Sequence, residues 1–172
     1  MKNEIEVWIR GQIPDISPFL QPTAHALLQV QEDIEYHLSA DLDDMLWEKP
    51  FGMASIAFHV RHIIGVTDRM FTYARNESLN EDQFDYLKNE SIFHEHIDSY
   101  FLKTALHNQI NSAIQQLKTI KESEITEVRY LGRQRIPSTL IGLLFHAAEH
   151  AQRHFGQLLV TLSILKNSKP SI

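Results

Sequence analysis

Three histidines recur at four-residue intervals in the stretch FHAAEHAQRHFGQLL, which covers residues 145–159. Residues four apart lie on the same side of an α-helix, so His150 and His154 can hold one metal ion between them. At about 100° per residue, His146 lies nearly opposite the apolar stripe of this helix and is the weaker candidate. Glu149 is adjacent to His150 in sequence, and adjacent residues of a helix point about 100° apart, so we do not expect Glu149 to act as a general base.

A metal site in a helical bundle also needs ligands from a facing helix. The stretch AFHVRHII offers His59 and His62, and either of them completes a three-histidine site. Rotation about the helix axis puts His59 nearer the middle of the apolar stripe and His62 to one side of it. Periodicity therefore slightly favours His59 for burial and leaves the choice of the third ligand open.

Four amphipathic segments, each with apolar residues at helical intervals, must position these histidines. The predicted helices cover approximately residues 21–39, 53–75, 97–121 and 138–166. Such helices bury their apolar stripes against one another, which predicts a single all-α domain over residues 1–172, a four-helix bundle. The polar segment NESLNEDQFDYLKNE belongs to the longest connector, and this length favours one crossover connection over a plain up-down order.

The stretch ITEVRYLGRQRIPS, between the third and fourth predicted helices, predicts two short extended pieces around Leu131 and Gly132. It also carries three arginines, Arg129, Arg133 and Arg135. Guanidinium groups at this place could hold a carboxylate or a phosphate. A solvated hairpin is the simpler interpretation, because charged residues near turns are commonly exposed.

The composition excludes several classes of function. The chain has 172 residues, a net charge of -6 and no dense cluster of lysine and arginine, so we expect no nucleic-acid partner. It has no cysteine, which excludes a thiolate metal ligand and a cysteine nucleophile, and any thiol chemistry must use an external thiol. No apolar run approaches the length that spans a membrane, and the first residues do not resemble a signal peptide. We therefore expect a cytoplasmic protein with no membrane partner.

Two histidine-bearing segments, SIAFHVRHI and EHAQRHFGQ, resemble the signature segments of the DinB-like (damage-inducible) metalloprotein superfamily. In that family, a histidine late in the helix that opens with Ser-Ile corresponds to His62. The family pattern H-x-x-x-H-x-G-Q matches His150, His154, Gly156 and Gln157. The resemblance thus implies that the metal ligands are His62, His150 and His154.

The resemblance also implies a fold, an assembly and a cofactor. These are a four-helix bundle with a crossover connection, a homodimer, and a bound divalent transition metal, which is nickel, zinc or iron. The family includes bacterial thiol-dependent transferases. The commonest family pattern has arginine directly after the second histidine of the pair, whereas this chain has Phe155 there and Arg153 before that histidine.

Three neutral histidine ligands leave coordination positions open for water or substrate, which is the layout of a catalytic metal site. One resulting hypothesis is metal-assisted hydrolysis of a small molecule such as an amide or an ester. The other is thiol transfer, in which an external low-molecular-weight thiol attacks an electrophilic small-molecule substrate. The alternative to both enzymes is a non-catalytic metal-binding or structural bundle, because a fold alone does not establish catalysis.

Overall fold

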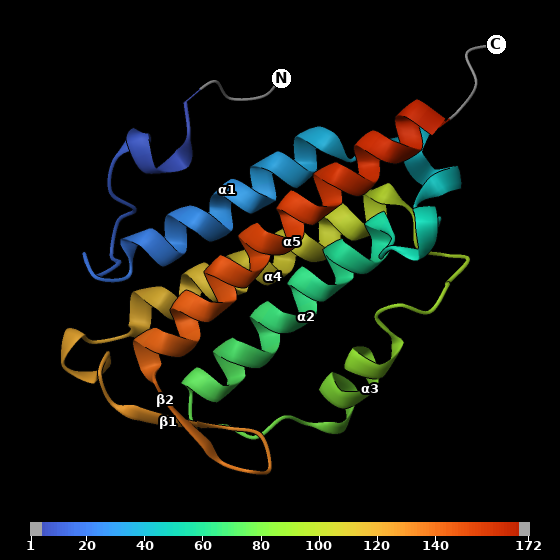
Figure 1. Cartoon of the computed structure of the whole chain (residues 1–172). Helices are drawn as coiled ribbons and strands as arrows, with labels where there is room; N and C mark the ends of the chain where they lie inside the picture. The colour runs from blue at the N-terminus through green and yellow to red at the C-terminus, as the bar shows by residue number, and fades with distance from the viewer. Residues whose placement is uncertain (1–4, 169–172) are drawn as a thin grey trace.

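The computed structural model describes residues 5–168, and four long helices packed side by side make up most of it (Figure 1). These bundle helices are α1 (Gln21–His37), α2 (Ile56–Ala74), α4 (Ser99–Thr119) and α5 (Leu140–Ser168). Their apolar side chains form one core, in which α4 and α5 each lie against both α1 and α2. The structure confirms the predicted all-α fold.

The order of the four helices includes a crossover connection. α1 and α5 run in one direction along the bundle, and α2 and α4 run in the opposite direction (Figure 1). Since α2 and α4 run the same way and pack against each other, the chain returns along the length of the bundle between them. This return is the crossover that the long polar segment predicts, and α2 and α5 are antiparallel neighbours.

The crossover contains a further helix, α3 (Glu81–Asn89), where the sequence predicted only a polar connector. A capping box begins it: the Asn80 side chain accepts from the Gln83 amide, and the Gln83 side chain accepts from the Asn80 amide. The Gln83 side chain also donates to Asp68 and Thr72 of α2, at 2.7 and 2.8 Å. These contacts stabilise a helix that is too short to be stable alone.

Side-chain caps explain why two bundle helices begin later than periodicity predicted. The Ser55 hydroxyl accepts a hydrogen bond from the amide three residues further on, so α2 begins after Ser55 and not near residue 53. The Asp98 carboxylate caps α4 in the same way, and this helix begins after Asp98 and not near residue 97. Short 3-10 helices lie at Val7–Arg10, Ala40–Met45, Pro50–Gly52 and Glu122–Glu124.

A two-stranded antiparallel hairpin joins α4 to α5, as the sequence predicted. Its strands are β1 (Val128–Leu131) and β2 (Ile136–Thr139), which pair in a register that sets Val128 opposite Thr139. Gly132 follows β1 with a φ of 62°, a conformation that glycine adopts without strain. The hairpin therefore turns directly after the first strand.

The expectation of a wholly solvated hairpin was wrong for one of its arginines. Arg133 and Arg135 are exposed, but Arg129 is buried. Its guanidinium donates, at 2.8 Å, to the carbonyl of Ala74, which is the last residue of α2. Arg129 thus ties the hairpin to the bundle, because a carbonyl at a helix end has no partner within its own helix.

α2 is buried over most of its surface, and some of its buried side chains are polar. Among them are His59, Arg61 and Arg69. Buried polar groups need hydrogen-bond partners, and the partner of His59 is His154, one of the predicted metal ligands. Within residues 5–168, no helix combines the length and the apolar character needed to cross a membrane.

Candidate metal centre

The side chains of His62, His150 and His154 converge between α2 and α5. One ring nitrogen from each histidine lies within 4.8 Å of those from the other two. His62 Nε2 lies 2.9 Å from His150 Nε2. The His154 ring centroid lies 4.4 Å from that of His62 and 4.6 Å from that of His150. This group could hold a metal ion, and it consists of the three residues that the family resemblance implied.

Helix geometry accounts for this convergence. His150 and His154 lie one turn apart on α5, so their rings stand one above the other. The neighbouring α2 presents His62 to both of them. Phe58, one turn before His62, stacks on its ring with centroids 5.3 Å apart and ring planes at 18°. This stacking restricts rotation of the His62 ring, so the protein itself holds the ring in place.

His59, which periodicity favoured for burial, is only 3% exposed and lies outside the group of three. Its Nδ1 lies 3.1 Å from the Nδ1 of His154. When His154 Nδ1 donates and His59 Nδ1 accepts, neutral His154 has no proton on Nε2, and that nitrogen is available to the site. His59 is therefore a hydrogen-bond partner of His154.

The environment lowers the pKa of several of these imidazoles. Burial, reinforced by the neighbouring His62, lowers the pKa of His150 to about 4 and that of His154 to about 3. Burial likewise lowers the pKa of His59 to about 4, with a smaller effect from His62. His59, His150 and His154 are therefore neutral at pH 7, and neutral imidazole is the form that binds a metal ion.

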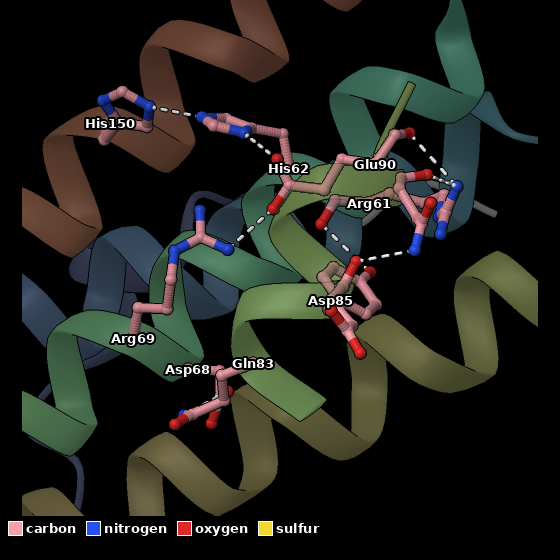
Figure 2. A network of polar contacts seen from close by, with 10 residues as sticks. Arg61, His62, Asp68, Arg69, Gln83, Asp85, Glu90 and His150 are labelled. Carbon is pink, nitrogen blue, oxygen red and sulfur yellow. Dashed lines mark hydrogen bonds and ion pairs between the residues drawn. The ribbon is translucent and has the colours of Figure 1, made fainter. Parts of the chain in front are cut away.

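The sequence did not single out Glu90, a carboxylate that contacts the site. Its side chain is 3% exposed and accepts a hydrogen bond from His62 Nδ1 at 2.6 Å (Figure 2). Its other oxygen accepts from the buried Arg69 guanidinium at 2.7 Å. Because a neutral imidazole carries one proton, donation from Nδ1 leaves His62 Nε2 without a proton and directed at His150. The capping pattern of Asn80 and Gln83 is a sequence signal for α3, the helix that Glu90 directly follows.

The hydrogen bonding of His150 follows from that of His62, and the donor set of the site decides whether a metal ion fits here. His62 Nε2 is an acceptor, so neutral His150 must donate to it from Nε2. His150 Nδ1 is then a buried acceptor, and it has no hydrogen-bond partner among residues 5–168. An ion held at the Nε2 atoms of His62 and His150 would replace the proton between them and would not satisfy this Nδ1. The fit follows from the donor set, because three imidazole nitrogens are ligands that transition metals accept, so the residues fit a divalent transition metal.

A second group, His146, Glu149 and His150, could also hold a metal ion. His146 Nδ1 lies 2.9 Å from a Glu149 oxygen, and the His146 side chain is 45% exposed. Arg153 donates to both Glu149 oxygens at 2.5 and 2.6 Å, so its guanidinium competes with any cation for this carboxylate. The group that contains His62 is the better candidate, since none of its members is engaged by a cationic side chain.

A helical bundle whose antiparallel helices bring histidines to one point defines a class of helical proteins with an internal site suited to a metal ion. The sequence model of the DinB superfamily matches residues 26–158, which run from α1 into α5 and include all three histidines. The chain therefore belongs to the DinB superfamily, whose members often bind metal. No curated protein matches the chain.

The residue after His154 contributes to the core. Phe155 is buried, and its ring centroid lies 6.0 Å from that of His37 on α1. Arg153, the nearest arginine in the sequence, is paired with Glu149. At the position where the family commonly has arginine, this chain therefore has an aromatic contact between α5 and α1.

Proposed function

We propose that this protein is a metal-dependent enzyme that binds one divalent transition metal through His62, His150 and His154. The observation that carries the proposal is the convergence of one ring nitrogen from each histidine within 4.8 Å. The lowered pKa values of His150 and His154 support it, because they keep these rings neutral at physiological pH. Nickel, zinc and iron are the ions proposed, since each accepts imidazole ligands.

Three neutral ligands favour a catalytic role over a structural one, because they leave coordination positions open for a small molecule. An ion bound there supplies Lewis acidity, which favours the deprotonated form of a thiol or a water molecule. The protein's own contribution is to orient the ligands. Phe58 and Glu90 hold the His62 ring from two sides, and His59 holds His154.

The proposed reaction is the transfer of an external low-molecular-weight thiol to an electrophilic small molecule. The thiol sulfur forms a bond to the electrophilic atom, the thiol proton is lost to solvent, and the leaving group departs with its bonding electrons. A chain without cysteine cannot supply this sulfur itself. Metal-assisted hydrolysis of a small amide or ester is the second candidate, because water can occupy the same open positions.

The metal content of untagged protein, purified without chelators, tests the proposed site. We expect nearly stoichiometric metal in the wild type and its loss in the His62→Ala and His154→Ala variants. The matched control is His107→Ala, which removes an exposed histidine from α4 and should leave the metal content unchanged. A tag-free protein is necessary, because a histidine tag would bind metal by itself.

Two results would contradict the proposal. A wild-type protein that stays free of metal after incubation with nickel, zinc or iron has no such site. Metal retained equally by all three variants would place the ion elsewhere. For the loaded protein, we expect consumption of a thiol together with an electrophile, abolished by a chelator and restored by added metal. Turnover of amides or esters without a thiol would support hydrolysis instead.

A further inference from the structure

Glu90 directly follows α3 and is buried, and a buried carboxylate is unfavourable unless its charge is compensated. Figure 2 shows that its two oxygens have different partners on α2. Oε2 accepts from His62 Nδ1 at 2.6 Å, and Oε1 accepts from Arg69 at 2.7 Å. The guanidinium supplies the compensating charge, so the contact with His62 can be made by a neutral imidazole.

The backbone around Glu90 is held by contacts from α2. The Arg61 guanidinium donates to three nearby backbone carbonyls, those of Asn89, Glu90 and Ile92, at 2.6, 3.2 and 3.2 Å. The Tyr86 hydroxyl donates to the Arg61 carbonyl at 3.1 Å. The carboxylate therefore extends toward α2 from a fixed backbone position.

α2 has no side chain at Gly65, where the Glu90 carboxylate lies against it. A Cβ atom at this position would collide with Glu90 Oε1, and it would lie 2.7 Å from Arg69 Nη1 and 2.9 Å from the Tyr86 ring. Glycine within a helix costs about 1 kcal/mol of stability relative to alanine. Gly65 therefore makes room for Glu90 at the expense of intrinsic helix stability.

From this geometry we propose that Glu90 is a positioning residue, which fixes His62 in the Nδ1–H tautomer and directs its Nε2 lone pair toward His150 and His154. A carboxylate bonded to the second nitrogen of a histidine ligand orients the ring and raises its basicity. Since Glu90 acts through His62, this inference rests on the metal site proposed above. It extends that site to the residue that directly follows α3, where α3 packs against α2.

Glu90→Gln tests the tautomer directly, because it keeps the side-chain shape and replaces one oxygen with an amide group. Arg69 donates toward Oε1, so the glutamine oxygen should face Arg69 and its amide group should face His62 Nδ1. His62 Nδ1 must then accept, and its proton moves to Nε2. In histidine proton–nitrogen NMR of the metal-free protein, we expect the Nδ1–H form in the wild type and the Nε2–H form in the variant.

The variant should also bind metal more weakly. With Co²⁺ as the probe and a chelating dye as competitor, we expect Glu90→Gln to bind about 10- to 100-fold more weakly than the wild type. The visible absorption of bound Co²⁺ should change as well, because it reports the ligand set. The matched control is Asp85→Asn, which removes an exposed carboxylate from α3 that pairs with Lys88 at 2.9 Å. It should keep the affinity, the absorption spectrum and the His62 tautomer of the wild type.

Measurements on His62→Ala separate the two levels of the hypothesis. If His62→Ala loses Co²⁺ while Glu90→Gln keeps the wild-type affinity and tautomer, the metal site stands and the role of Glu90 is wrong. If His62→Ala binds Co²⁺ as tightly as the wild type, the metal site itself is wrong. The tautomer of His62 can also be measured in the wild-type protein, so this test does not depend on whether a variant folds. A wild-type His62 ring in the Nε2–H form would overturn the role of Glu90.

Discussion

The metal-free protein is expected to lose stability as the pH falls, because His59, His150 and His154 are neutral when folded. In the unfolded chain each has the ordinary histidine pKa of about 6.5. Folding lowers the pKa to about 4 for His59 and His150 and to about 3 for His154. Between these values the unfolded chain binds more protons than the folded protein. The contribution to stability is therefore complete above about pH 6.5 and is lost progressively toward about pH 4 for His59 and His150 and toward about pH 3 for His154.

The magnitude of this loss is clearest for His59, which is almost fully buried. At pH 5, its lowered pKa predicts a loss of about 2 kcal/mol in the free energy of unfolding, at about 1.4 kcal/mol per pKa unit. His150 and His154 are only partly buried, and solvent screening makes each of their contributions smaller. The rings also lie close together, so protonation of one disfavours protonation of the next and the losses do not add.

Urea unfolding in the presence of a chelator, followed by circular dichroism at about pH 5 and about pH 7.5, measures this loss. His59→Gln keeps a polar side chain that cannot titrate, and it should reduce the pH-dependent loss by about 2 kcal/mol. The matched control, Ile63→Val, removes one buried methylene from the same helix and should cost about 1 kcal/mol at both pH values. Equal free energies of unfolding at the two pH values in the wild type would refute the electrostatic reasoning.

Three further predictions concern the site and one helix end. His150→Ala should lower the metal affinity in a chelator competition more than His146→Ala does, and equal losses would indicate that the second histidine group holds the ion. Gly65→Ala should lower both the melting temperature and the metal affinity, since the added methyl group displaces Glu90, and wild-type values of both would show that the space is not needed. Asp98→Ala removes the cap of α4 and should cost about 1 kcal/mol in urea unfolding. Its metal affinity should stay unchanged, and a lower affinity would contradict the separation of this cap from the site.

The sequence predicted those features of the site that depend on one helix. The four-residue spacing of His150 and His154 sets their rings on one side of α5, and the rings lie there with centroids 4.6 Å apart. The apolar stripe of α2 predicted that His59 is the more buried histidine, and His59 is buried whereas His62 is half-buried. Both predictions require only the rotation per residue of an ideal helix.

Periodicity could not decide which histidine of α2 joins the pair on α5. That choice depends on how α2 is rotated about its own axis relative to α5, and the packing of both helices sets this rotation. His62 lies at the edge of the apolar stripe, where a side chain can reach a neighbouring helix and keep some contact with solvent. The resemblance to the DinB family indicated His62 where the residue pattern alone did not.

Glu90 could not be predicted, because its role depends on the path of the crossover. α2 and α4 run in the same direction, so the chain after Ala74 must return along the bundle before α4 begins at Ser99. A short loop would make the two helices antiparallel and would bring no further element alongside α2. The longer return allows α3 to pack on α2 and to place a carboxylate against His62 from outside the core. The crossover topology thus supplies the polar partner that a histidine from a bundle of four helices would otherwise lack.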